Sequence, residues 1–151
     1  MDKIKMSGRE VVEKSRAYTF FSWAVQTEVA PIPIERAEGV YFWDSDGKRY
    51  LDFSSQLMNL NIGHQHPRVV KAITQQAEQL CYAHPGMATE PRARLGELVA
   101  GISPGDLSKT FFCLGGAEAN ENAIKIARMF TGRHKIISQY ISYHGATPVS
   151  Y

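Results

Sequence analysis

Residues 111–128, FFCLGGAEANENAIKIAR, combine features that could bind an anion. A short apolar run leads into Gly115 and Gly116, and a helical pattern starts directly after the two glycines. Free N–H groups and the dipole make a helix start attractive to anions, and glycines let a phosphate approach the backbone closely. A plain turn between a strand and a helix explains the same pattern. Neither the Walker pattern nor G-x-G-x-x-G is present, so the glycines alone leave both interpretations open.

A second group with possible chemistry is the stretch S-Y-H-G at residues 142–145. It follows an apolar run that is typical of a buried strand, and open α/β sheets bind ligands at the carboxyl ends of their strands. Tyr143 therefore offers a flat ring to a ligand, although a half-buried loop aromatic is the simpler interpretation. His144 is a lone histidine, and such histidines are more often structural than catalytic.

Three histidines, His64, His66 and His84, raise the question of a metal site. Neither a cysteine nor a carboxylate lies at ligand spacing from them, so we predict no zinc or other metal.

The elements that position these residues follow from hydrophobic spacing and punctuation. Residues 110–114 and 134–140 are apolar runs that predict two buried strands, and the helix between them ends at Thr131 and Gly132. This order predicts one βαβ unit of a parallel sheet. A lone βαβ unit leaves sheet edges and faces uncovered, so we expect the chain to be the front part of a longer protein.

The first part of the chain predicts a different organisation. A short helix capped by Ser7 is expected within the first twenty residues, and the two prolines in residues 29–34 require an extended segment. Aromatic-rich runs at residues 40–43 and 49–53 flank an Asp-Gly turn, which predicts a β-hairpin. Two further helices are expected to begin at Pro67 and Pro91.

Composition limits the class of protein. The 151 residues are 44% hydrophobic and 11% aromatic with a net charge of +2, which predicts a globular protein with a core of ordinary size. The absence of basic blocks argues against a nucleic-acid-binding surface, and the absence of long apolar windows against a membrane span. The N-terminus lacks a signal-peptide pattern, and Cys81 and Cys113 are the only cysteines. We therefore expect a soluble, cytoplasmic protein.

Four strings, in the right order, resemble the class III (ω-type) aminotransferases, which are pyridoxal-phosphate (PLP) enzymes of fold type I. They are EGVYFWDSDGKRYLD at 38–52, N-I-G-H followed by H-P within 61–67, GGAEANE followed by AIKIAR within 115–128, and SYHGAT at 142–147. The resemblance extends from residue 20 to residue 151, and it implies that His64 and His66 are structural residues, with His66 close to the start of a helix. Four ordered strings are far more specific than any one of them.

This resemblance implies a cofactor-binding set: Gly115, Gly116, Ala117, Tyr143, His144 and Gly145. The N–H groups of Gly116 and Ala117 would bind the cofactor phosphate, Tyr143 would stack on the pyridine ring, and the two residues after it would shape the loop. The family more often has Ser-Gly-Ser or Ser-Gly-Thr at positions 115–117. Two hydroxyl contacts are therefore missing here, whereas the backbone contacts remain possible.

The resemblance also implies a substrate pocket that includes Phe21, Trp23 and Met58. The N-terminal aromatic stretch of related enzymes lines the substrate entrance. Many relatives have tryptophan where this chain has Met58, so the sequence does not identify the amine substrate.

The implied fold is an α/β fold of type I. Residues 1–60 would form the helix and hairpin segment of the small domain, and residues 61–151 the start of an incomplete large PLP-binding domain with its first βαβ unit. The implied reaction transfers an amino group from an amine or ω-amino acid to a 2-oxo acid through PLP. The active sites of this family lie at a dimer interface, so a homodimer or a higher homo-oligomer is implied.

No catalytic residue is assigned within the chain. The Schiff-base lysine and the aspartate on the pyridine nitrogen lie, in relatives, beyond the position of Tyr151, and no lysine here matches that context. These 151 residues alone are expected to be inactive. Two alternative functions are compatible with the same motifs. One is a non-catalytic phosphate-binding or assembly module, and the other is another PLP enzyme of fold type I, such as a decarboxylase or an aminomutase.

Overall fold

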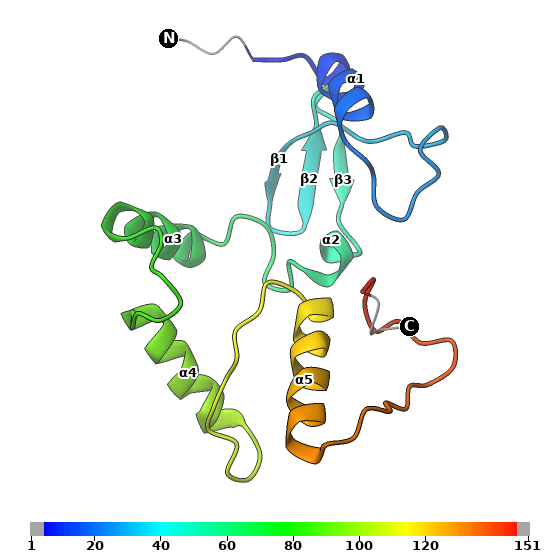
Figure 1. Ribbon diagram of the computed structural model, residues 1–151. Helices are drawn as coiled ribbons and strands as arrows, with labels where there is room; N and C mark the ends of the chain where they lie inside the picture. Colours follow the sequence, from blue (N-terminus) through cyan, green and yellow to red (C-terminus); the bar gives the residue numbers. More distant parts are fainter. Residues whose placement is uncertain (1–4, 148–151) are drawn as a thin grey trace. The chain divides into compact units, whose positions relative to one another are not determined.

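The computed structural model describes residues 5–147, and its elements are labelled in Figure 1. The elements are α1 (Gly8–Tyr18), β1 (Ile34–Glu38), β2 (Tyr41–Asp44), β3 (Arg49–Leu51), α2 (Ser55–Met58), α3 (Pro67–Gln79), α4 (Glu90–Ile102) and α5 (Gly116–Thr131). Two units follow from the pattern of contacts, the first reaching to Tyr82 and the second beginning at Ala83. The expected domain boundary after residue 60 remains a prediction for the complete fold.

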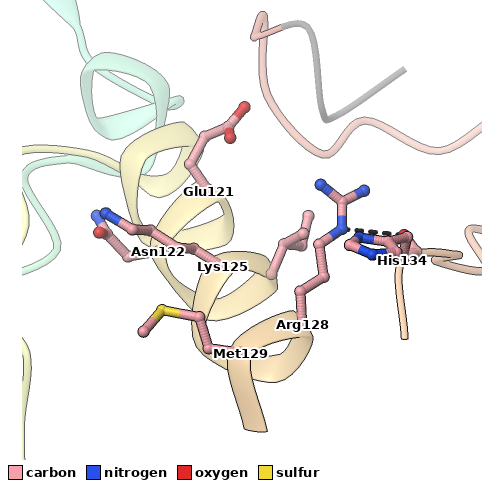
Figure 2. Close-up of a pocket in the computed structure, with 7 residues that line it drawn as sticks. Glu121, Asn122, Lys125, Arg128, Met129 and His134 are labelled. Atoms are coloured by element: carbon pink, nitrogen blue, oxygen red, sulfur yellow. Dashed lines mark hydrogen bonds between the residues drawn. The ribbon is translucent and has the colours of Figure 1, made fainter. Parts of the chain in front are cut away.

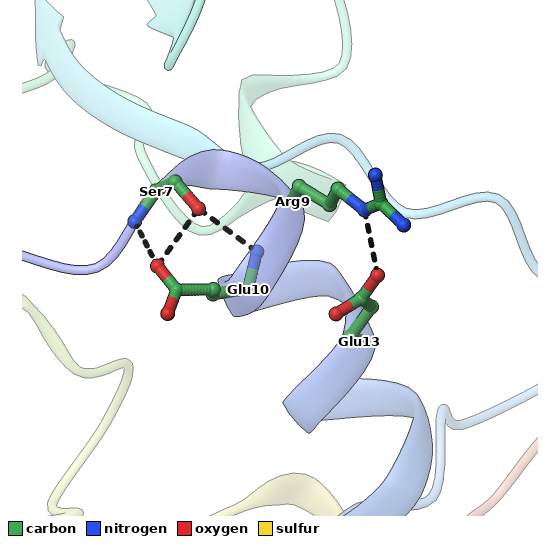
Figure 3. A network of polar contacts seen from close by, with 4 residues as sticks. All are labelled: Ser7, Arg9, Glu10 and Glu13. Carbon is green, nitrogen blue, oxygen red and sulfur yellow. Dashed lines mark hydrogen bonds and ion pairs between the residues drawn. The ribbon is translucent and has the colours of Figure 1, made fainter.

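Helix α1 begins at the cap that the sequence predicts (Figure 3). The Glu10 N–H donates to the Ser7 hydroxyl at 3.3 Å, and the Ser7 N–H donates to the Glu10 carboxylate at 2.8 Å. This reciprocal pair is a capping box, which satisfies two otherwise unpaired N–H groups. Hydrogen bonds from the backbone and the hydroxyl of Ser7 lower the pKa of Glu10.

We expect Ser7→Ala to destabilise the first turn of α1 by about 1 kcal/mol, because alanine cannot accept the capping hydrogen bond. Ser15→Ala, a substitution in the middle of the same helix, is the matched control. Amide hydrogen exchange should accelerate at the start of α1 in the first variant only. Equal protection of these amides in the two variants would contradict the assignment of Ser7 as the cap.

The predicted hairpin is confirmed and gains a third strand that the sequence analysis missed. Strands β1, β2 and β3 form an antiparallel sheet in chain order, with Phe42 opposite both Ala37 and Tyr50. The rings of Phe42 and Tyr50 stack at a centroid distance of 5.0 Å. The Asp44 carboxylate closes the turn, since it accepts hydrogen bonds from the Tyr50 hydroxyl and from the N–H of Lys48. This sheet provides the framework of the first unit.

The three predicted longer helices are confirmed. Pro67 opens α3, Pro91 lies in the first turn of α4, and α5 begins immediately after Gly115. Proline fits the first turn because those N–H groups have no intrahelical acceptor. Helix α5 ends at Gly132, whose φ of 67° is left-handed.

The predicted βαβ unit is only partly formed. Helix α5 is present, but residues 110–114 and 134–140 form no β-strand within the part of the chain that the structure describes. A strand exists only when its N–H and C=O groups pair with a neighbouring strand. Residues 5–147 contain no such neighbour for either segment, so their apolar sequence alone does not create a sheet.

The expectation of a core of ordinary size is wrong for these residues. Phe42 is the only buried hydrophobic residue among residues 5–147. Leu114 and Phe130 are 100% and 91% exposed, although their types and positions are typical of an interior. An amphipathic element buries its apolar face only when another element packs on it, and the described residues do not supply that element for α5.

Candidate functional site

The start of α5 presents backbone N–H groups that no acceptor in the described chain satisfies. Gly115 is the N-cap with an extended backbone, and no side chain caps the helix. The N–H groups of Gly116 and Ala117 have no acceptor among the described residues. Because α5 is 16 residues long, its dipole adds positive potential at these N–H groups. This end of the helix can therefore bind an anion through its backbone.

The backbone conformation at this point does not require the two glycines. Neither Gly115 nor Gly116 has a positive φ, so the chain geometry itself tolerates other residues at both positions. A Cβ atom added at either glycine would meet no atom of the described chain within 4 Å. The glycines thus leave open space at the helix start, where a bound group can reach the N–H donors.

Glu118 fixes how the chain enters the helix. Its carboxylate accepts a hydrogen bond from the Leu114 N–H at 2.8 Å. Ala119 N–H donates to the Gly115 carbonyl at 3.0 Å, which starts the regular helical pattern. These two contacts hold the segment around the glycines without using the N–H groups of Gly116 and Ala117. Glu118 lies in the first turn of α5, where the helix dipole also favours a carboxylate.

The loop that carries Tyr143 is connected to α5. The Asn120 side-chain amide donates to the His144 carbonyl at 2.6 Å, across 24 residues of sequence. Gly145 is buried and has a φ of 126°, a conformation that favours glycine. Tyr143 is 69% exposed, so its ring is accessible. The structure therefore associates two of the predicted groups, the glycine turn and the Tyr143 loop, through Asn120, which the sequence analysis did not single out.

A separate hollow of about 600 Å³ lies along α5, away from its first turn (Figure 2). Its lining includes Lys125, Arg128 and Met129 together with His134 from the segment after the helix. Arg128 Nε donates to the His134 carbonyl at 2.9 Å, which joins two residues of this lining. None of the predicted cofactor-binding residues lines it, so it is distinct from the candidate site.

Two of the predicted pocket residues lie in a loop of the first unit that Gln26 closes. The Gln26 side chain accepts from the Phe21 N–H at 3.0 Å and donates to the Phe21 carbonyl at 2.7 Å. Trp23 lies within this closed loop, has a φ of 55° and is 74% exposed. Gln26 therefore orders the segment that presents Trp23, a contact that no local sequence pattern indicates.

The third predicted pocket residue, Met58, lies in a left-handed turn that the sequence did not predict. The four residues of α2 have φ angles between 49° and 64°. Residues other than glycine adopt this conformation at a cost, and strained segments are concentrated at functional sites. Met58 is 73% exposed at the end of this turn.

His64 has a structural role, as the sequence analysis expected. Its Nε2 lies 2.7 Å from Oδ2 of Asp52, and both side chains are largely buried. His64 also pairs with Gly39 through two backbone hydrogen bonds. Gly63 next to it has a φ of 85°, and an added Cβ would lie 2.9 Å from the Gly39 carbonyl oxygen. His66 is the N-cap residue of α3, in agreement with the predicted place near a helix start.

We expect the Asp52–His64 pair to make the free energy of unfolding depend on pH in the acidic range. Burial by itself would raise the pKa of Asp52, but hydrogen bonds from the Gln56 N–H and from His64 outweigh it, and the pKa is lowered. A carboxyl group whose pKa is lowered on folding stabilises the protein at pH values above its ordinary pKa, near 4. This stability is lost as the pH falls through the lowered pKa. Thermal unfolding between pH 2 and pH 5 should therefore depend less steeply on pH in Asp52→Asn. Identical slopes in the two proteins would contradict this assignment.

The described residues lack two other kinds of feature. Across residues 5–147, no three His, Cys, Asp or Glu side chains gather as they would around a metal ion. Within the same residues, no helix has the length and apolar composition that crossing a membrane requires.

Comparison with known proteins gives consistent matches. The family model described as aminotransferase class-III matches residues 22–150. The crystal structure of taurine:2-oxoglutarate aminotransferase from Bifidobacterium kashiwanohense, in complex with PLP and glutamate, is similar with a TM-score of 0.92 and 45% identity. The match covers 98% of this chain and 33% of that one.

The chain also matches about a third of the length of curated relatives. An acetylornithine aminotransferase from Methanothermobacter thermautotrophicus is 37% identical over 142 residues, which are 94% of this chain and 35% of the relative. A leucine/methionine racemase from Thermococcus litoralis is 38% identical over 144 residues, 94% of this chain and 32% of the relative. The chain thus spans about a third of the length of these proteins.

Proposed function

The chain belongs to the class III aminotransferase family, and from this membership we propose that it forms the N-terminal third of a PLP-dependent aminotransferase. The complete enzyme would transfer an amino group from an amine or ω-amino acid to a 2-oxo acid. The observation that carries the proposal is the family match over residues 22–150, which includes both the glycine turn and the Tyr143 loop. The lysine and the aspartate that act on the cofactor in this family would lie outside these 151 residues, which would be inactive alone.

The residues at the start of α5 suit a phosphate. Two N–H groups without an acceptor in the described chain, at Gly116 and Ala117, supply the donors, and the open space at the two glycines admits a tetrahedral group. No hydroxyl side chain occupies positions 115–117, so the backbone would make the contacts there. We assign the phosphate of PLP to this point.

Tyr143, His144 and Gly145 would complete the cofactor site. PLP, when bound, supplies an electron sink for the bond changes at the amine-bearing carbon. The exposed ring of Tyr143 would hold the pyridine by offset stacking and exclude water from one of its faces. His144 and Gly145 would set the loop geometry, supported by the hydrogen bond from Asn120 to the His144 carbonyl.

Phe21, Trp23 and Met58 would contribute to the substrate pocket. Phe21 is half-buried, whereas Trp23 and Met58 are exposed and have constrained backbones. These features support the proposal, because the segments of Trp23 and Met58 keep large apolar side chains on the surface of the first unit. Methionine is flexible and fills irregular gaps, so Met58 would accept an amine of less planar shape than a tryptophan would.

We further propose a homodimer or a higher homo-oligomer in the cytoplasm. Cys81 and Cys113 are both free, which suits a reducing compartment. A partner subunit would supply part of each active site, as the family resemblance implies.

The activity test uses the full-length protein and a panel of ¹⁵N-labelled amines and ω-amino acids, each with a 2-oxo acid. We expect ¹⁵N to appear in the amino acid derived from the 2-oxo acid, and PLP to be required. Absence of transfer from every donor by a folded, PLP-loaded protein would overturn the proposal. An open reading frame that ends at residue 151 would instead favour a non-catalytic module.

A racemase is the second candidate function, because one relative at 38% identity is a leucine/methionine racemase. Racemisation needs no 2-oxo acid, whereas amino-group transfer does. Incubation with a single amino acid in D₂O therefore separates the two. Inversion with deuterium uptake at the α-carbon, without a 2-oxo acid, would identify the racemase.

A further inference from the structure

The hydrogen bond between Asn120 and His144 joins two segments that are far apart in sequence. Asn120 Nδ2 lies 2.6 Å from the His144 carbonyl oxygen. The segment after α5 is also attached near the other end of the helix, where Arg128 Nε donates to the His134 carbonyl at 2.9 Å. In Figure 1 this segment leaves the end of α5 and returns toward its start. Asn120 therefore supplies one contact that holds the returning end.

The position of Asn120 relates this contact to the anion site. Asn120 lies four residues after Gly116 on α5, and residues four apart lie on the same face of a helix. On the loop side, the fixed carbonyl belongs to the residue directly after Tyr143. One side chain thus relates the turn that would bind the phosphate to the loop that would carry the stacking ring.

The backbone conformation of the loop depends on contacts of this kind. Ile141 has a φ of 57° and the buried Gly145 a φ of 126°, so two left-handed residues bracket Tyr143. Such conformations persist only where surrounding contacts enforce them. The Asn120 amide supplies one of those contacts, at the peptide between His144 and Gly145.

We propose that Asn120 is a positioning residue, which holds the loop at residues 142–145 against α5 so that Tyr143 lies correctly for the group bound at Gly116 and Ala117. This inference rests on the proposed PLP-dependent function. Asn120 would act through Tyr143 and would not itself contact the cofactor. Its effect on cofactor affinity should therefore depend on the presence of the tyrosine ring.

A double-mutant cycle on the full-length protein tests this dependence. Asn120→Ala should weaken PLP binding by about 3- to 10-fold, the range expected for one lost hydrogen bond. In the Tyr143→Ala background the same change should weaken binding less than about 2-fold, because residues that act together are not additive. The induced circular dichroism of bound PLP should fall in Asn120→Ala, since a less ordered ring environment reduces it.

Asn122→Ala is the matched control. Asn122 lies on the same helix, and its amide donates to the Glu118 carbonyl within the helix at 2.9 Å, not to the loop. It should leave both PLP affinity and circular dichroism unchanged. Asn120→Asp, which places an acceptor opposite the His144 carbonyl, provides a second variant of nearly equal size and should reproduce the loss if Asn120→Ala does not fold.

The outcomes separate this inference from the proposed function. A wild-type protein that does not bind PLP would overturn the function itself. If the wild-type protein binds PLP, two results would overturn only the positioning role of Asn120. Asn120→Ala could weaken PLP binding equally in both backgrounds, or it could weaken binding in neither. Loss confined to the background that contains Tyr143 would support this role.

Discussion

Gly116→Pro is expected to weaken PLP binding by the full-length enzyme by about 2–4 kcal/mol, roughly 30- to 1000-fold in Kd. Proline removes the Gly116 N–H, one of the two donors assigned to the phosphate, and its ring also fills the open space at the helix start. The helix itself should persist. Gly116 is the first residue of α5, a position that tolerates proline, and Gly115 before it is already extended, as a residue before proline must be.

Two further variants separate the lost donor from the added bulk. Gly116→Ala keeps the N–H and adds one methyl group, so it should weaken binding less than proline does. Gly116→Val keeps the N–H but adds a branched side chain that obstructs close approach, and its loss should exceed that of alanine. Equilibrium dialysis of PLP with each apoenzyme measures the affinities, and Gly101→Val in α4 controls for a valine at an exposed helical glycine. Wild-type affinity in folded Gly116→Pro would identify Gly116 as an ordinary turn residue.

Tyr143→Ala is the other change with a large expected effect. Removing the ring should cost about 1–3 kcal/mol of PLP affinity, because both the apolar contact and the stacking are lost. The ring is accessible for such a contact, since 69% of Tyr143 is exposed. Its loop is held at the next residue by Asn120, so the ring is presented in a defined place.

Tyr143→Phe distinguishes stacking from chemistry of the hydroxyl group. Phenylalanine keeps the flat face and should bind PLP almost as tightly as the wild type. Fluorescence titration of the apoenzyme with PLP provides the affinities of all three proteins. A phenylalanine variant as weak as the alanine variant would assign the important contact to the hydroxyl, and two unchanged variants would leave Tyr143 as a loop residue only.

Local sequence signals predicted the elements whose causes are local. The Asp-Gly turn indicates the β2–β3 hairpin, and Ser7 with Glu10 indicates the start of α1. Pro67 and Pro91 similarly mark helix starts, because proline is favoured where the N–H has no acceptor. Each of these structures is determined by residues within a few positions of one another.

Features that depend on distant partners could not be predicted in the same way. Residues 110–114 and 134–140 have strand-like composition, but a strand requires neighbours, and the chain spans about a third of the length of its relatives. The same shortage of partners leaves apolar side chains such as Phe130 exposed. The sequence indicates which residues have the type and spacing of an interior, whereas the tertiary structure decides which of them are covered.

The candidate site also combines features that the sequence reveals with a contact that it does not reveal. Its two motifs are visible in the sequence as a glycine turn before a helix and an aromatic loop after an apolar run. The contact between them is not visible, because Asn120 resembles any polar residue on an amphipathic helix and its partner is 24 residues away. The left-handed turn at α2 is also hidden, since none of its four residues is a glycine that would signal positive φ.

The most direct test of the central claim is a crystal structure of the full-length protein with PLP. We expect the cofactor phosphate at the start of α5, with its oxygens 2.7–3.2 Å from the N–H nitrogens of Gly116 and Ala117, the usual range for such hydrogen bonds. We also expect the ring of Tyr143 over one face of the pyridine. A phosphate bound at another place, with these two N–H groups facing water, would show that the assigned site is wrong.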